Sequence, residues 1–468
     1  MNPELTSLIQ PDRGQDARDI HLIDPKGYDA WFAAQPPRHR AAIAAQRLTP
    51  TGYANAILPG DGPEQWSVVS VVANVDNLSP WCLAKLAETL PEGHYRLAGR
   101  DPGPALLGWL LGQYRFDRYR RDDKAAGPRV LLTSDPARVD EAVRIARATF
   151  KVRDLVNTPA SDLGPADLEA EAQALGKAHG ASITVTKGPD LERGYPMIHT
   201  VGRAAARGRE PRLIELEWGN PAHPRIAIVG KGVCFDSGGL DIKPSAAMRL
   251  MKKDMGGAAH ALALAELVMA SRLPVRLHLL IAAVENSVSG DAFRPGDVLA
   301  TRKGLTVENT NTDAEGRLIL GDALTRAVEG APELILDFAT LTGAARVALG
   351  PDLPAMFAND DALADALLDA GKAVSDPMWR LPLWDGYDEM LKSDIADLVN
   401  AADGPFAGSI TAALFLRRFV PAEIAWAHFD TFSWRPAAKP GRAKGGDAQG
   451  LRASWAMLKV RYGAERRP

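Results

Sequence analysis

The octapeptide Asn311-Thr-Asp-Ala-Glu-Gly-Arg-Leu318 is the stretch around which the rest of the chain is organised. It places the carboxylates of Asp313 and Glu315 two residues apart, with Arg317 two residues further on. In an extended segment, residues i and i+2 point the same way, so we expect these side chains to face one pocket. An apolar helical pattern follows. The stretch therefore predicts a bound cation, although an acid that stabilises the start of a helix would give a similar pattern.

The composition is that of a globular chain large enough for two domains. Of its 468 residues, 46% are hydrophobic and 24% are charged, and this length predicts two domains. The net charge of -3 argues against a general binder of nucleic acid or anionic membranes. Two cysteines without a CxxC pattern argue against a disulfide framework and a thiolate zinc site.

The lack of a recognisable targeting signal predicts a cytoplasmic protein. The N-terminus lacks the basic and then apolar pattern of a signal peptide. No apolar run reaches the length of about 18–20 residues that a membrane span needs. We therefore expect no membrane partner.

The first part of the chain predicts a small N-terminal α/β domain over residues 1–135. Its strand-like runs are 66–73 and 129–133, and residues 105–114 are apolar and helix-like. Over 136–156, apolar residues recur at helical spacing, which predicts one long connecting helix. Asn157-Thr-Pro159 should end it, because the residue before a proline avoids the α region.

Residues 157–468 predict a larger C-terminal catalytic domain. Strands are expected at 182–186, 213–217, 225–229, 275–284 and 334–338, with helices at about 256–271 and 318–329. This alternation predicts an α/β fold whose mostly parallel central sheet is flanked by helices. Binding sites in such sheets form where the chain leaves the carboxyl ends of the strands. We therefore expect the functional residues in those loops.

A glycine-rich segment follows the strand predicted to end at Val229. Residues 230–244 hold Lys231, Asp236 and Lys243 between glycines that permit turns. The Gly-Lys pair suggests a nucleotide phosphate loop, but the upstream glycine is replaced by Arg225, and Gly232 follows the lysine where Ser or Thr is required. A phosphate loop is therefore disfavoured.

Four carboxylates are expected to converge at the ends of successive strands. Asp254 begins a helix, where it would also suit a helix cap, and it joins Asp236, Asp313 and Glu315. Unpaired carboxylates repel one another strongly, and two divalent cations would neutralise four of them. Oxygen ligands favour Mg²⁺ or Mn²⁺, although Zn²⁺ also accepts carboxylate. Such a two-metal site activates water and polarises a carbonyl or phosphoryl oxygen.

The basic residues of these segments can take different roles beside the metals. A lysine binds a metal only as the neutral amine, so cations and burial must lower its pKa. A second lysine that stays protonated could stabilise an oxyanion, and Arg317 could bind an anion through two donors.

The segments 230–244, 251–258 and 311–318 together resemble the signature of the leucyl aminopeptidase family, the dimetal exopeptidases also called cytosol aminopeptidases. The segments 153–160, 339–343, 408–413 and 428–430 resemble the same family. The resemblance covers about residues 135–468, whereas residues 1 to about 100 match little.

This resemblance implies a ligand set for two divalent ions, Mn²⁺ or Zn²⁺ and alternatively Mg²⁺. One ion would be bound by Asp236, Asp313 and Glu315. The other would be bound by a set that shares two of these residues, namely Lys231, Asp236, Asp254 and Glu315.

The resemblance also implies the remaining roles in the site. Lys243 would polarise the scissile carbonyl, and Arg317 would hold a bicarbonate that acts as general base. The substrate would contact Met251, Asn311, Thr340, Leu341 and Gly343. The family further implies a homohexamer with active sites that face inward.

The sequence thus predicts a metal-dependent aminopeptidase that releases N-terminal amino acids, leucine-like and of broad range, from peptides. A two-metal phosphoesterase is the alternative from another reaction class, because Lys231, Lys243 and Arg317 also suit phosphate. A non-catalytic DNA-binding role is a second alternative, which the net charge disfavours. Asp241 stands where the family usually has a small polar residue. It could alter the metal preference, but it is interpreted as a solvated acid.

Overall fold

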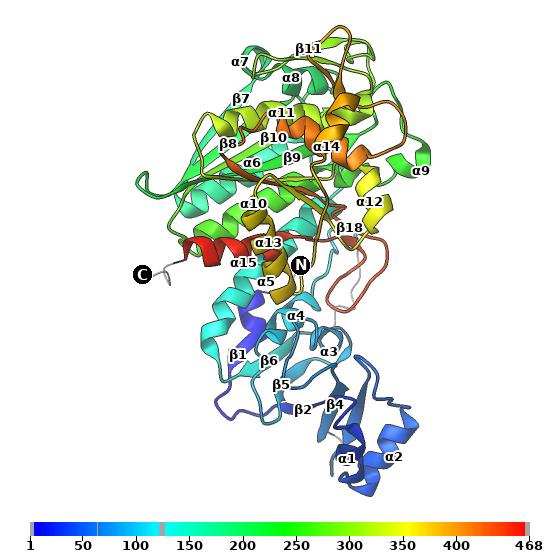
Figure 1. The fold of residues 1–468 in the computed structure, drawn as a ribbon. Coiled ribbons are helices and arrows are strands. Elements are labelled where there is room, and N and C mark those ends of the chain that lie inside the picture. Colours follow the sequence, from blue (N-terminus) through cyan, green and yellow to red (C-terminus); the bar gives the residue numbers. More distant parts are fainter. Residues whose placement is uncertain (1–3, 63, 121–126, 464–468) are drawn as a thin grey trace. The chain divides into compact units, whose positions relative to one another are not determined.

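The computed structural model describes residues 4–62, 64–120 and 127–463, which divide into two compact units (Figure 1). One unit holds the chain up to Phe150 together with Ala437–Lys444, and the other holds Lys151–Pro436 and the chain from Gly445 on. No helix within these described ranges is long and apolar enough to cross a membrane.

The first unit is built on a six-stranded sheet with the order β1-β6-β5-β2-β4-β3. All neighbours in it are parallel except β3 and β4. Its strands are β1 (Ile9–Pro11), β2 (Arg18–Ile23), β3 (Asn55–Pro59), β4 (Trp66–Val71), β5 (Gly93–Leu97) and β6 (Arg129–Thr133). Its helices are α1 (Tyr28–Ala33), α2 (Pro37–Ala45), α3 (Ala84–Thr89) and α4 (Ala105–Leu111). The core of this unit includes the buried rings of Tyr95 and Trp109, whose centroids lie 5.7 Å apart.

Helix α5 (Val139–Asn157) follows a 3-10 turn at Pro136–Arg138. It begins in the first unit and ends in the second. The side-chain oxygen of Asn157 accepts a hydrogen bond from the backbone of Gly446 at 2.8 Å, so the end of the helix is tied to a distant part of the chain within the second unit.

The second unit is built on an eight-stranded sheet with the order β15-β14-β17-β13-β9-β10-β8-β7. The central strands β17, β13, β9 and β10 are parallel, whereas β8 and β7 join antiparallel at one side, and β14 pairs antiparallel with β17 at the other. The strands are β7 (Ser182–Lys187), β8 (Arg212–Trp218), β9 (Arg225–Asp236), β10 (Arg276–Asn286), β13 (Leu334–Ala339), β14 (Ala355–Ala358), β15 (Trp379–Arg380) and β17 (Ala425–Asp430). The predicted α/β class with a mostly parallel sheet is confirmed.

Helices cover both faces of this sheet (Figure 1). On one face, α11 (Glu315–Val328) packs against β9 and β10, with α8 (Pro196–Gly202) and α14 (Gly408–Arg417) beside it. On the other face, α10 (Gly256–Ala270) packs against β9, β10 and β13, with α6 (Pro165–His179) and α15 (Leu451–Tyr462) beside it. Because α10 lies between the sheet and further helices, its apolar residues are buried almost all round. The central strands of the sheet are therefore buried on both faces.

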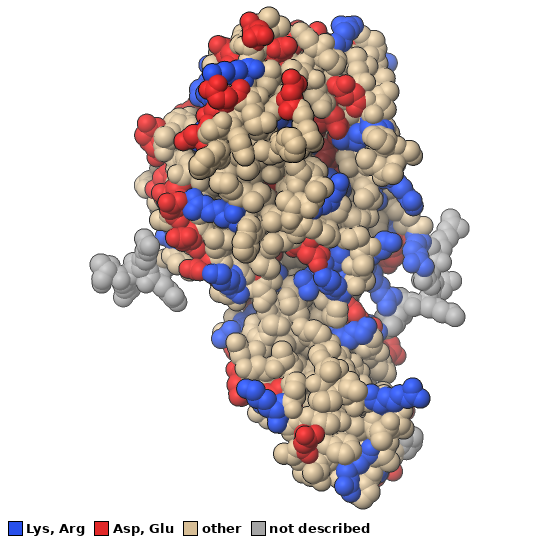
Figure 2. All heavy atoms as spheres, turned by 45° about the vertical axis from the view of Figure 1, so that its right-hand side comes forward, with Lys and Arg blue, Asp and Glu red and all other residues tan. Residues whose placement is uncertain are grey.

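Shorter elements complete the second unit. A three-stranded sheet holds β11 (Val298–Ala300), β12 (Thr306–Glu308) and β16 (Leu398–Val399), and β18 (Trp434–Arg435) pairs with β19 (Gly445–Gly446). The remaining helices are α7 (Pro189–Gly194), α9 (Ser245–Met248), α12 (Gly343–Leu349) and α13 (Asp361–Ala373). Acidic and basic side chains are interspersed over the face that Figure 2 shows, as the small net charge leads one to expect.

Candidate active site

Strand β9 carries two of the predicted site residues, Lys231 and Asp236. Both were predicted in a loop after Val229, which was wrong, because β9 continues to Asp236. The strand stays paired with β10, where Lys231 lies opposite Ala282 and Asp236 lies opposite Asn286. Both side chains are thus positioned by a central strand of the sheet.

After β9, Gly238 and Gly239 adopt the positive φ angles of +87° and +64° that the expected turns need, whereas Gly230 within β9 and Gly257 in α10 serve close packing. A Cβ at Gly257, in the first turn of α10, would lie 2.1 Å from the carbonyl oxygen of Phe338 in β13. A Cβ at Gly230 would lie 2.7 Å from Cα of Ala258. The start of α10 therefore lies directly against the sheet. This contact brings the preceding 3-10 helix Met251–Met255, which carries Asp254, to the strand ends.

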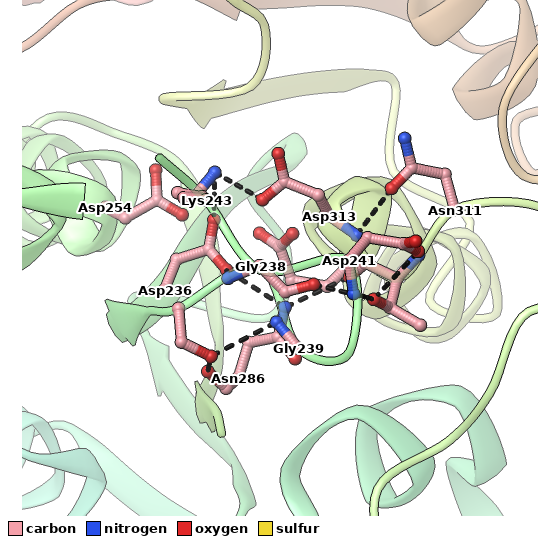
Figure 3. A network of polar contacts seen from close by, with 12 residues as sticks. Asp236, Gly238, Gly239, Asp241, Lys243, Asp254, Asn286, Asn311 and Asp313 are labelled. Carbon is pink, nitrogen blue, oxygen red and sulfur yellow. Dashed lines mark hydrogen bonds and ion pairs between the residues drawn. The ribbon is translucent and has the colours of Figure 1, made fainter. Parts of the chain in front are cut away.

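Asp236 is held in one orientation by donors on both of its oxygens (Figure 3). Its Oδ1 accepts hydrogen bonds from Asn286 Nδ2 and from the backbone of Gly238, both at 2.9 Å. Its Oδ2 lies 2.8 Å from Nζ of Lys243. Asn286 was not predicted, although the polar pair Glu285-Asn286 after the apolar run of β10 was a visible signal.

The octapeptide is not extended, so the reasoning from alternate residues was wrong for this stretch. Thr312–Ala314 form a 3-10 turn, and α11 begins at Glu315, earlier than predicted. The side chain of Asn311 caps the turn by accepting a hydrogen bond from the backbone of Asp313 at 2.8 Å. Because an amide supplies this cap, the two carboxylates of the octapeptide are left to face the pocket.

Gly316 makes room for the buried lysine of β9. A Cβ at this position would lie 2.6 Å from Nζ of Lys231. That amine lies 2.7 Å from Oδ2 of Asp254 and 2.9 Å from Oε1 of Glu315, and it donates a hydrogen bond to the carbonyl of Thr340 at 3.1 Å. The side chain of Lys231 is only 3% exposed.

The carboxylates around the two lysines control their protonation. Burial by itself would lower the pKa of Lys231, but Asp254, Glu315 and Asp236 outweigh burial and raise it. The pKa of Lys243 is raised in the same way by the carboxylates beside it. A bound divalent cation would reverse this balance, because its positive charge disfavours an ammonium beside it.

Three carboxylates form a group that fits a divalent cation. One oxygen each from Asp236, Asp313 and Glu315 lie within 4.8 Å of one another. Glu315 is 1% exposed, and among the described residues neither of its oxygens has a partner in hydrogen-bond geometry, although Lys231 approaches one of them. Burial together with the neighbouring acids raises the pKa of both Asp313 and Glu315. Carboxylates that crowd together at a largely buried place are suited to bind metal.

Asp254 does not cap α10, whose N-cap residue is Met255. Its Oδ1 accepts a hydrogen bond from the hydroxyl of Thr340 at 2.8 Å, and its other oxygen faces Lys231. Burial opposes ionisation of Asp254, but the neighbouring lysines outweigh burial and lower its pKa. The carboxylate is thus positioned beside Lys231, whose amine also faces Glu315.

Arg317 has donors that suit an anion. The residue is 8% exposed, and its Nη1 donates a hydrogen bond to the carbonyl of Asn400 at 2.7 Å. Its Nε has no hydrogen-bond partner among the described residues. Burial lowers the pKa of Arg317 to about 10, so the guanidinium remains charged at neutral pH. Its planar fork fits a carboxylate or a carbonate.

These groups lie around one cavity of about 370 Å³. Glu315 lies buried next to it, and every other predicted site residue lines it, namely Lys231, Asp236, Lys243, Met251, Asp254, Asn311, Asp313, Arg317, Thr340, Leu341 and Gly343. Lining residues that the sequence analysis missed include Lys253, Arg346, Asp430 and Phe432.

Asp430 organises the loop after β13. Its carboxylate accepts hydrogen bonds from the backbones of Leu341 and Thr342, at 2.9 and 3.1 Å, and from the hydroxyl of Thr342 at 2.6 Å. The backbone N–H of Leu341 is therefore already committed within the chain.

Comparison with known proteins agrees with this arrangement. The catalytic domain of the cytosol aminopeptidase family matches residues 150–454, and the N-terminal domain of M17 aminopeptidases matches residues 19–131. The chain belongs to the cytosol aminopeptidase family. The predicted family is thereby confirmed.

Individual relatives extend the similarity over most of the chain. A probable cytosol aminopeptidase from Syntrophotalea carbinolica is 43% identical over 362 residues, which cover 74% of this chain and 72% of the relative. The crystal structure of cytosol aminopeptidase from Coxiella burnetii is 42% identical, covers 97% of this chain and 99% of its own, and superposes with a TM-score of 0.92. The bottromycin maturation enzyme BotP in complex with Mn is 30% identical, covers 95% and 99%, and superposes with a TM-score of 0.82.

The chain is therefore a metal-dependent aminopeptidase, a hydrolase of the exopeptidase class. The acidic group at the cavity and the manganese complex of BotP agree with a requirement for divalent metal. The comparisons do not support the phosphoesterase or the DNA-binding alternative.

Proposed function

We propose that this aminopeptidase releases the first residue of peptides with a free N-terminus through two bound divalent ions. One ion would be held by Asp236, Asp313 and Glu315, whose oxygens approach one another within 4.8 Å. The second would be held by a set centred on the buried amine of β9, namely Lys231, Asp236, Asp254 and Glu315. The observation that carries this proposal is the convergence of these groups in one cavity.

The metal ions, when bound, supply the positive charge that activates water and polarises the scissile carbonyl. Lys243 would donate to the oxygen of that carbonyl, since its ammonium lies between Asp236 and Asp313 at the edge of the carboxylate group. Arg317 would hold a bicarbonate through its free donors, and this anion would accept the proton of the attacking water. Both basic residues thus act on the reacting atoms.

The pocket for the first side chain would be formed by Met251, Thr340 and Gly343, which line the cavity. Because the N–H of Leu341 donates to Asp430, Leu341 would offer its carbonyl oxygen to the substrate. Asn311 would contact the substrate from the capped turn. The thioether of Met251 is apolar and adapts to different shapes, so we expect a preference for leucine-like residues together with a broad range of other first residues.

We also propose that the ions are Mn²⁺ or Zn²⁺, and alternatively Mg²⁺. We propose further that the protein is a cytoplasmic homohexamer. Its N-terminal domain would cover residues 1–135, its connecting helix 136–156 and its catalytic domain 157–468. The assembly rests on the family resemblance, and light scattering during gel filtration tests it. A mass of one chain at working concentration would contradict the hexamer.

The experiment that tests the proposed function is hydrolysis of leucine p-nitroanilide by metal-stripped protein after addition of Mn²⁺, Zn²⁺ or Mg²⁺. We expect activity to vanish with chelator and to return with metal, and the order of the three ions ranks their effectiveness. A phenyl phosphate substrate serves as the control for the other reaction class. Metal-dependent release of phosphate without release of nitroaniline would overturn the proposal.

A further inference from the structure

Two cations line the cavity without a role in the proposed reaction. Lys253 lies in the 3-10 helix Met251–Met255 and is only 5% exposed. Arg346 comes from α12 and is exposed to solvent. Both approach the ring of Phe432, with Nζ of Lys253 at 5.5 Å and Cζ of Arg346 at 4.7 Å from the ring centroid. Two distant segments thus place positive charge around one aromatic side chain.

Neither cation is well neutralised by the chain. The acidic contact of Lys253 is Oδ1 of Asp254 at 3.4 Å, and this carboxylate also faces Lys231 at 2.7 Å and Thr340 at 2.8 Å. Within the described residues, Arg346 forms no ion pair. A buried cation without a close counter-ion is costly, so an anion at this place would stabilise the site.

These cations border the part of the cavity proposed to receive the first side chain of the substrate. Lys253 follows Met251 by two residues in the same 3-10 helix. Nη2 of Arg346 would lie 3.8 Å from a Cβ at Gly343. Asp430, which also lines the cavity, already accepts three hydrogen bonds from the loop after β13. The charge of the two cations is therefore directed toward the substrate.

We propose that Lys253 and Arg346 bind a carboxylate on the side chain of the N-terminal residue, so that the enzyme also hydrolyses peptides that begin with glutamate or aspartate. The apolar stem of such a side chain would pack against Met251 and Phe432, and its carboxylate would neutralise the charge of the two cations. This assignment rests on the proposed function and extends its substrate range beyond leucine-like residues.

Discrimination by such a site follows from the charge of its two cations. A neutral isostere such as glutamine would leave Arg346 without an ion pair and Lys253 with only its 3.4 Å contact to Asp254, which lowers the binding of glutamine relative to glutamate. The guanidinium offers two parallel donors to a carboxylate, whereas the ammonium acts as a point charge. The two residues are thus not interchangeable, and each should contribute separately.

The C-terminal carboxylate of a dipeptide could also bind to these two cations. Two pairs of substrates separate these sources. Glutamyl and glutaminyl p-nitroanilide differ only in the side-chain charge, whereas Leu-Gly and Leu-Gly amide differ only in the charge at the C-terminus.

The experiment compares kcat/KM for both pairs in the metal-loaded enzyme and in the variants Lys253→Met, Arg346→Gln and Arg207→Gln. Lys253→Met keeps the length of the buried side chain, and Arg346→Gln tests the exposed residue in case the buried change disturbs folding. Arg207 is exposed and does not line the cavity, so its variant removes one charge as a matched control. Leucine p-nitroanilide reports the proposed function itself.

We expect the wild type to have a higher kcat/KM for glutamyl than for glutaminyl p-nitroanilide. The ratio of the two values should fall roughly tenfold in Lys253→Met and in Arg346→Gln, and it should be unchanged in Arg207→Gln. A wild type that hydrolyses the leucine substrate but does not prefer glutamate would overturn this inference and leave the proposed function intact. Selectivity that follows the C-terminal charge alone would also overturn it. Loss of hydrolysis for every substrate would instead reject the proposed function.

Discussion

Asp241 and Thr312 are joined by a pair of hydrogen bonds that link two separate segments of the site (Figure 3). Oδ2 of Asp241 accepts from the backbone of Thr312 at 2.7 Å, and the hydroxyl oxygen of Thr312 accepts from the backbone of Asp241 at 2.9 Å. The same hydroxyl lies 2.6 Å from the carbonyl oxygen of Gly238 and donates to it. The interpretation of Asp241 as merely solvated was therefore wrong, because this exposed acid positions the residue before Asp313.

Asp241→Ala is expected to weaken the affinity for divalent metal by roughly tenfold, because groups that orient a ligand typically affect metal binding on this scale. The exposed site limits the effect on folding. Titration of the stripped enzyme with metal, followed by restored activity and by calorimetry, measures the affinity for the metal. Asp241→Asn keeps an acceptor for Thr312 and serves as the control, so an equal loss in both variants would contradict a positioning role.

Glu315→Gln is expected to lower turnover by about a hundredfold or more, because it removes the charge of a ligand proposed for both ions. The isosteric change should leave the fold intact, which circular dichroism and the thermal midpoint check. Glu192→Gln changes an exposed glutamate of the same unit and should behave as wild type. Near-normal turnover in a folded Glu315→Gln enzyme would exclude the proposed ligand set.

Arg317→Met is expected to remove any stimulation of the wild-type enzyme by bicarbonate and to lower turnover about tenfold or more, because the pair of donors that would hold the anion is lost. Turnover of both enzymes is measured in buffer free of carbonate and after addition of bicarbonate. Arg317→Lys keeps the charge without the planar fork, and it should respond only weakly. Equal stimulation of Arg317→Met and wild type would place the anion elsewhere.

His428→Gln is expected to destabilise the enzyme more at pH 6 than at pH 9. Burial alone would lower the pKa of His428, but Asp337 and Asp430 outweigh burial and raise it above the ordinary value near 6.5. A raised histidine pKa contributes stability that is complete below the unfolded pKa and is lost as pH rises through the folded pKa. Thermal midpoints of both proteins across this range measure the difference.

The control for this pH dependence is His94→Gln, whose histidine is exposed. Because exposed side chains contribute little to stability, this variant should have nearly the wild-type thermal midpoint. A difference for His428→Gln that grows as pH rises would contradict the predicted direction.

Gly257→Ala is expected to lower the stability by about 1–3 kcal/mol, because the added Cβ would meet the carbonyl of Phe338 at 2.1 Å and force α10 away from the sheet. The shift should also reduce activity, since α10 follows the segment that carries Asp254. Gly290→Ala, where a Cβ meets nothing within 4 Å, is the control. Denaturant midpoints compare the two variants with wild type.

Much of the fold and the identity of the site residues could be predicted from the sequence. The apolar runs of β9, β10 and β13 alternate with helical patterns, and this local periodicity is enough to predict a parallel sheet with covered faces. The order of carboxylates and lysines along the chain likewise predicted a two-metal site. The reaction was predicted by the resemblance of 230–244, 251–258 and 311–318 to the aminopeptidase family.

The detailed geometry could not be predicted, because it depends on contacts between residues that are distant in the chain. The end of β9 is set by its pairing with β10, and the conformation of the octapeptide is set by a cap and by Asp241, 71 positions away from Thr312. Local periodicity carries no information on such partners. The sequence by itself determined the chemistry of this aminopeptidase. The packing of α10 and α11 onto opposite faces of the central strands decided which charges meet, since a buried charge is stabilised only by the groups that the fold brings against it.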